Sequence, residues 1–118
     1  MGLVGMISEE VITQEFIRVV NRVYPKTGEL LNLCYVKIKD FHDKKLDKRF
    51  YYLAIYCPDR VVATLQLREG QLKDIAENMG LIDVICVRAT HLLNDPNSKI
   101  KEENPRLWLE LNWIVSRD

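Results

Sequence analysis

Residues 31–67 read LNLCYVKIKDFHDKKLDKRFYYLAIYCPDRVVATLQL and carry the strongest pattern in the chain. Apolar and polar side chains alternate in residues 31–41, 50–57 and 60–67, which is typical of half-buried β-strands. A Pro-Asp pair separates the last two stretches and favours a tight turn. The pattern predicts three consecutive antiparallel strands.

Two later stretches also read as strands. Residues 106–115, RLWLELNWIV, alternate, so that one face would carry Trp113 and the other Trp108. We expect Trp113 on the core side and Trp108 free for an interface or a ligand. Residues 81–93 form a more continuous apolar run, which is compatible with a central strand.

A helix is predicted between these strands, over residues 70–80. Leu72, Ile75, Ala76 and Met79 follow the spacing of one helix face. Gly80 can end such a helix in the left-handed conformation.

The segment of residues 8–24 fits two structures. Its apolar residues suit one helix face, and Ser8 could cap that helix. However, valine and isoleucine dominate, and residues 24–28, YPKTG, resemble a hairpin turn. We favour a strand here, with the helix as the alternative.

The element order predicts the fold class. It is mainly β: a five- to six-stranded antiparallel OB-type barrel with one helix between strands 3 and 4, with another small β-barrel as the alternative. With 118 residues, 47% of them hydrophobic, the chain fits one domain spanning residues 1–118.

Composition excludes several classes of protein. No apolar run reaches the length of a membrane span, and the first residues lack the pattern of a signal peptide, so we expect a cytoplasmic protein. Cys34, Cys57 and Cys86 are widely spaced in apolar runs, which favours buried, reduced thiols over a metal site. No phosphate loop or nucleophile motif occurs, and we expect no enzymatic activity, metal or cofactor.

Alternation sorts the predicted strands into two faces. The expected core face carries Cys34, Val36, Ile38, Tyr51, Leu53, Ile55, Cys57, Val61, Ala63, Leu65 and Leu67. The opposite face mixes aromatic rings with cations and polar groups. Its candidate binding residues are Tyr35, Lys37, Lys39, Phe41, Phe50, Tyr52, Tyr56, Arg60 and Arg68.

This mixture suits single-stranded nucleic acid, since rings stack on unpaired bases while Lys and Arg follow the phosphates. We expect Phe41, Phe50, Tyr52 and Tyr56 to stack, and the four basic residues to contact phosphates. The net charge is zero, from 17 basic and 17 acidic side chains, which counts against a broad duplex-binding surface. Residues 37–49 nevertheless carry six basic residues against three acidic ones.

The chain resembles a diverged member of the bacterial single-stranded-DNA-binding protein family over residues 11–115. The resemblance lies in element order and in the stretches RVYPKTGELLNLCYVKIKDFHD and RFYYLAIYC. It implies an OB-fold that binds single-stranded DNA before RNA, with Phe41, Phe50 and Tyr56 near the family's stacking positions. The chain departs from the family in having no Trp at those positions and no Gly- and Pro-rich acidic tail.

A protein-interaction or assembly module on the same barrel is the alternative function. Zero net charge, the missing tail and the expected exposure of Trp108 motivate it. Homo-oligomerisation is expected under both hypotheses, because exposed strand edges commonly pair.

Overall fold

The computed structural model describes residues 8–93 and 99–116. The elements follow in the order α1 (Glu9–Val23), α2 (Pro25–Leu31), β1 (Tyr35–Asp43), β2 (Lys48–Cys57), α3 (Asp59–Leu67), α4 (Glu69–Asn78), β3 (Val84–Arg88), α5 (Ala89–Leu93), α6 (Ile100–Glu103) and α7 (Pro105–Ser116). The fold is therefore α/β, with most described residues in helices.

The strands form one open sheet in the order β1-β2-β3. Strands β1 and β2 are antiparallel and make a long hairpin, in which Tyr35 lies opposite Tyr56 and Phe41 opposite Phe50. Strand β3 runs parallel to β2, with Leu53 opposite Val84. Helices α3 and α4 form the crossover between these parallel strands, as parallel pairing requires.

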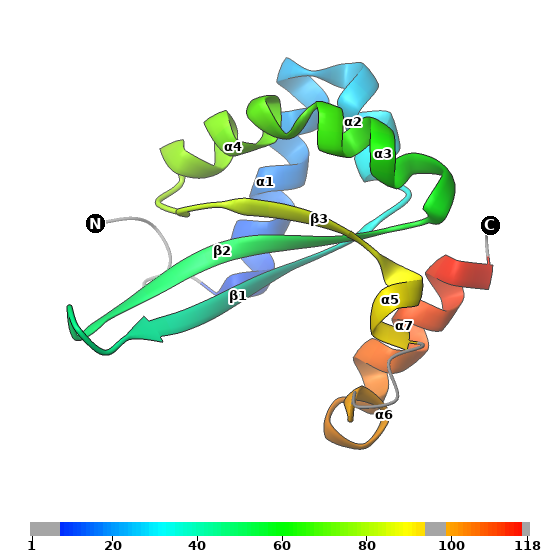
Figure 1. Cartoon of the computed structure of the whole chain (residues 1–118). Coiled ribbons are helices and arrows are strands. Elements are labelled where there is room, and N and C mark those ends of the chain that lie inside the picture. Colours follow the sequence, from blue (N-terminus) through cyan, green and yellow to red (C-terminus); the bar gives the residue numbers. More distant parts are fainter. Residues whose placement is uncertain (1–7, 94–98, 117–118) are drawn as a thin grey trace.

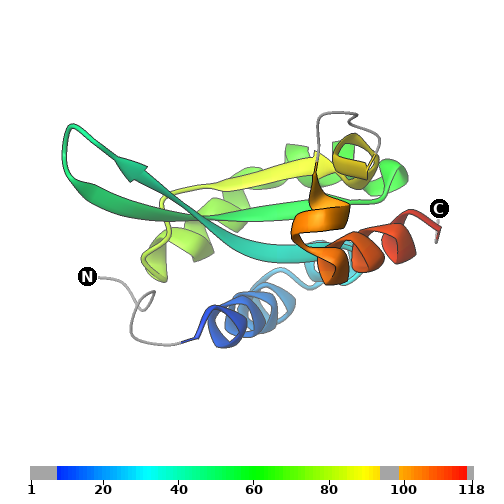
Figure 2. The same ribbon diagram turned by 90° about the horizontal axis from the view of Figure 1, so that it is seen from below.

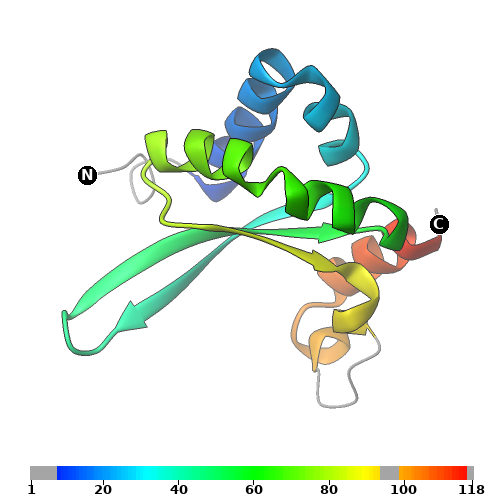
Figure 3. The same ribbon diagram turned by 45° about the horizontal axis from the view of Figure 1, so that its top comes forward.

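Helices lie on both faces of the sheet, but unequally. Helices α2 to α4 lie above the sheet in Figure 1, α1 passes behind it on the side of β1, and α5 to α7 lie below one end of it. The tip of the β1–β2 hairpin projects beyond the helices (Figures 1 and 3). Viewed from below, the end of the sheet at the hairpin tip has no helix over it (Figure 2).

Two clusters of buried side chains match these two helix layers. The larger cluster joins Phe16 of α1 and Leu72 of α4 to the upper face of the sheet. The smaller cluster joins Leu111 of α7 to Ala54 and Tyr56 on the lower face. Burial of these apolar side chains is the main force that holds the helices on the sheet.

The predicted OB-type barrel is wrong, because four of the segments expected as strands are wholly or partly helical. Residues 8–24 form α1 and its two caps, with the Ser8 hydroxyl accepting a hydrogen bond from Val11 N at 3.3 Å. Ile12, Phe16 and Val20, four residues apart, are buried on one face. The expected hairpin turn at residues 24–28 instead begins α2, with Pro25 in its first turn.

Residues 60–67 and 106–115, which were also expected as strands, are helical as well. Both stretches alternate, but each also has helical spacing: Val61, Val62 and Leu65 are buried in α3, and Leu107, Leu111 and Ile114 are buried in α7. The Pro-Asp pair begins α3, with Pro58 at the N-cap and Asp59 as the first helical residue, and is not a turn between strands. As a result, Ala63 and Leu67, which were expected in the core, are exposed. Trp113 is exposed and Trp108 half-buried, the reverse of the expected arrangement.

The run of residues 81–93 is only partly a strand. Strand β3 occupies its middle and lies at the edge of the sheet, and α5 follows it directly. The sheet is therefore open at both β1 and β3.

The predicted helix near residues 70–80 is confirmed as α4. Leu72, Ile75 and Ala76 are buried, and Gly80 has a φ of 86°. Gly80 N donates to Glu77 O at a distance of 3.1 Å, and Leu81 N donates to Ala76 O at 3.0 Å. This pair of bonds is the Schellman ending that a glycine at this position favours.

Candidate functional site

One face of the hairpin carries the aromatic and basic residues that alternation placed together. The pairing register puts Lys39 of β1 opposite Tyr52 of β2, Phe41 opposite Phe50 and Tyr35 opposite Tyr56. Lys37 lies opposite Ala54, a small side chain. Because alternate residues of a strand share a face, seven of the nine candidate residues lie on this one side of the sheet. They are Tyr35, Lys37, Lys39, Phe41, Phe50, Tyr52 and Tyr56.

Helix α7 covers one end of this face. Leu107 and Leu111 of α7 pack with Tyr56, which is 5% exposed. Tyr35 is half-buried beside it, and the two tyrosine rings stack with their centroids 6.1 Å apart. Tyr35 and Tyr56 therefore belong to the α7 interface and offer little ring surface to a ligand.

The other end of the face is not covered by any described residue of a helix (Figure 2). We call the side chains Lys37, Lys39, Phe41, Phe50, Tyr52 and Ile85 the open face. Phe41 is 45% exposed, and its ring centroid lies 5.4 Å from that of Phe50 and 6.3 Å from that of Tyr52. Three rings thus form a continuous apolar surface at the projecting end of the hairpin.

Positive charge adjoins these rings. The ammonium of Lys39 lies 5.7 Å from the centre of the Tyr56 ring, a cation–π distance. Lys37 and Lys39 make no ion pair with a described residue. The charged pairs of the hairpin lie on its other face, where Arg49 bonds Asp40 at 2.7 Å and His42 contacts Asp47 at 3.0 Å.

The remaining two candidate residues lie elsewhere. Arg60 is in α3, on the opposite side of the sheet from the open face. Arg68 follows α3 and donates a hydrogen bond to the Thr27 hydroxyl at 3.3 Å. It therefore links the end of α3 to α2, away from the open face. Both were placed on the face by reading residues 60–67 as a strand.

The neutral phenol of Tyr35 and the carboxylate of Glu110 lie together at the covered end of the face. Burial raises the pKa of Tyr35 to about 12, and the nearby Glu110 carboxylate adds to the rise. Glu110 also lies 3.7 Å from the Arg106 guanidinium. The Tyr35 phenol consequently stays protonated and can donate to Glu110 over the usual working range of pH.

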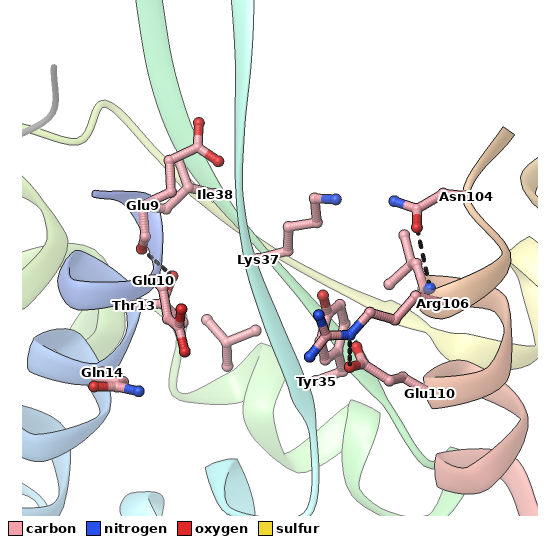
Figure 4. A pocket seen from close by; sticks show the side chains of 12 residues that line it. Glu9, Glu10, Thr13, Gln14, Tyr35, Lys37, Ile38, Asn104, Arg106 and Glu110 are labelled. Carbon is pink, nitrogen blue, oxygen red and sulfur yellow. Dashed lines mark hydrogen bonds and ion pairs between the residues drawn. The ribbon is translucent and has the colours of Figure 1, made fainter.

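A groove along the outer edge of β1 was missed by sequence reasoning (Figure 4). Its volume is about 460 Å³. Residues 35–38 form its floor, the start of α1 forms one wall, and the start of α7 forms the other. No local sequence signal could have revealed it, because it requires α1 and α7 to be helices.

The three cysteines, far apart in sequence, lie together in the core. Cys57 and Cys86 are buried on neighbouring strands, and all three thiols are free. Hydrogen bonding with Cys34, together with burial, raises the pKa of Cys57. Hydrogen bonding with Cys57 and burial raise the pKa of Cys86. Among the residues that the structure describes, no group of three His, Cys, Asp or Glu is arranged to hold a metal ion.

No helix within residues 8–93 and 99–116 is long and apolar enough to span a membrane. Comparisons with models of protein families, with curated proteins and with solved structures gave no match to this chain.

Proposed function

We propose that the chain is a non-catalytic module that binds single-stranded nucleic acid on its open face. One observation carries this proposal: the ring cluster of Phe41, Phe50 and Tyr52, in which Phe41 is 45% exposed, shares its side of the hairpin with Lys37 and Lys39. Unpaired bases have flat apolar faces next to charged phosphates, so they match a surface that offers rings beside cations.

The rings and the lysines would contribute differently. Stacking of one base on an aromatic side chain is worth about 1–3 kcal/mol and tolerates any base. Each lysine that contacts a phosphate displaces counterions from the nucleic acid. The logarithm of the association constant then falls with the logarithm of the salt concentration, with a slope of about −0.7 per contact for a single strand. With two lysines on the face, we expect a slope near −1.4 and little sequence preference.

The position of this surface also supports a binding role. Phe41 and Phe50 lie on a hairpin that extends past the helix layer, so an extended strand has access to the rings. No side chain of the open face distinguishes deoxyribose from ribose. Single-stranded DNA and single-stranded RNA should therefore both be assayed. The cytoplasmic location and the homo-oligomeric state expected from the sequence stay predictions, to be tested by fractionation and by light scattering.

The experiment is a fluorescence-anisotropy titration of labelled oligothymidine and oligouridine, each of about 15 nucleotides. It is run at about 50 mM and about 200 mM salt. We expect micromolar binding at low salt that weakens as salt rises. Absence of binding to both oligomers at low salt would contradict the proposal.

A further inference from the structure

The outer edge of β1 presents backbone groups that have no strand partner in the part of the chain that the structure describes. Leu53 N donates to Asp83 O at 3.0 Å, and Tyr51 O accepts from Ile82 N at 2.9 Å, so odd-numbered residues of β2 bond toward β3. Even-numbered residues of β2 therefore bond toward β1, where the register pairs them with odd-numbered residues. The N–H and C=O groups of Val36 and Ile38 consequently point away from the sheet.

These groups open into the groove between α1 and α7. Figure 4 shows β1 running between the two helices, with Glu9 and Glu10 of α1 on one side and Arg106 of α7 on the other. An unpaired edge normally invites another strand unless a protein blocks it. No strand among residues 8–93 and 99–116 covers this edge, which borders a groove of about 460 Å³.

Helices α1 and α7, which form the walls of the groove, limit the shape of a molecule that could bind there. A second copy of this chain would bring its own α1 and α7 beside its own β1, into the space where these two helices already stand. A single extended segment has no such flanking helices and can lie along β1. The geometry therefore favours a peptide strand over a β1–β1 dimer.

The charged residues on the two walls determine which side chains a bound peptide would favour. A residue placed opposite Val36 or Ile38 would point to the same side as these residues, which is the side of α1. There it would meet the exposed carboxylates of Glu9 and Glu10, which form no ion pair with any described residue. On the other wall, Arg106 and Glu110 already compensate each other at 3.7 Å.

We propose that this groove binds an extended peptide of another protein as a fourth strand along β1, with Lys or Arg at alternate positions facing α1. Main-chain hydrogen bonds to Val36 and Ile38 supply the register, and the carboxylates of Glu9 and Glu10 supply the preference for basic side chains. The intervening side chains of the peptide lie on the side of Lys37 and should be uncharged.

The test uses fluorescein-labelled peptides of about seven residues, the usual length of a strand. One alternates Lys with Thr, one alternates Glu with Thr, and one is the Lys–Thr peptide with every backbone amide N-methylated. We expect saturable binding of the Lys–Thr peptide alone, since N-methylation removes the backbone donors of a strand. Failure of the Lys–Thr peptide to bind at about 1 mM, or equal binding of the N-methylated peptide, would overturn the proposal.

Two further measurements locate the site. The double variant Glu9→Gln, Glu10→Gln should weaken binding of the Lys–Thr peptide by about tenfold or more, while Glu29→Gln, Glu77→Gln should not. Hydrogen exchange at the Val36 and Ile38 amides of the unaltered chain should slow when the peptide binds. Unchanged exchange at both amides would overturn the proposal even if the double variant failed to fold.

Discussion

The ring of Phe41 lies 5.4 Å from the ring of Phe50, directly across the β1–β2 ladder. The pair lies at the projecting end of the hairpin, where no described helix covers it. Cross-strand aromatic pairs stabilise a sheet, but Phe41 remains 45% exposed and keeps part of its surface for a ligand.

Replacement of this ring should separate binding from folding. Phe41→Ala should weaken oligothymidine binding by about 5- to 150-fold, the loss of one stacked base. It should cost only about 1 kcal/mol of unfolding free energy, because the side chain is half-exposed. Trp113→Ala is the matched control, since Trp113 is 61% exposed but lies on α7. Equal losses of affinity in both variants would count against the open face.

Removal of the lysines should change the salt dependence. The double variant Lys37→Gln, Lys39→Gln should reduce the slope of affinity against salt by about 1.4. The control Arg22→Gln, Lys26→Gln removes two exposed cations from the opposite layer and should leave the slope unchanged. Anisotropy titrations over a salt series measure both, and identical slopes for all three proteins would refute the phosphate contacts.

Ionisation of Tyr35 should be visible and coupled to stability. Its pKa is about 12 against an ordinary value of 10.0. A raised pKa means that the folded state holds the proton more tightly, so this contribution to stability is complete below pH 10 and is lost as the pH rises toward 12. Ultraviolet titration should show a late-ionising tyrosine that Tyr35→Phe removes. Glu110→Gln should shift that late titration to lower pH.

The buried thiols should be unreactive until the chain unfolds. Since the pKa values of Cys57 and Cys86 are raised and both side chains are buried, the reactive thiolate is scarce and inaccessible. A thiol reagent at neutral pH should therefore label both only at the rate of unfolding, and at once in denaturant. Rapid labelling of either thiol in the native protein would contradict this packing.

Two glycines should respond in opposite directions to alanine. A Cβ on Gly28 would lie 2.4 Å from Asn21 Oδ1 and 2.8 Å from Asn21 Cα, so Gly28→Ala should force α1 and α2 apart and destabilise the chain by about 1–3 kcal/mol. Gly70 in α4 has no atom within 4 Å of such a Cβ. Gly70→Ala should stabilise the chain by up to about 1 kcal/mol, through higher helix propensity. Urea denaturation of both variants measures the difference, and a loss of stability in Gly70→Ala would contradict the open site.

The hairpin and its faces could be predicted from the sequence because the period of two is unambiguous there. Val36, Ile38, Leu53 and Ile55 are buried as expected, and Lys39 and Phe41 share the opposite face. These strands are half-buried, which is the situation in which alternation is informative.

The remaining segments failed because short apolar runs fit both periods. In residues 106–115, Leu107 and Leu111 satisfy alternation and helical spacing alike, and tertiary packing against Tyr56 favours the helix. A local signal for this helix was present but was not used: Asn104 caps its start, with its side-chain oxygen accepting from Leu107 N at 3.2 Å. The β1 groove and the cysteine cluster depend on contacts between distant segments, which no local pattern encodes.

The most direct measurement is an NMR map of the amide shifts that oligothymidine causes in the isotopically labelled chain. If single strands bind on the open face, the largest changes should fall on Lys39, Phe41, Phe50 and Tyr52, with α3 and α4 unaffected. Changes centred on the outer side of α7, or on the face shared by Asp40 and Arg49, would contradict it.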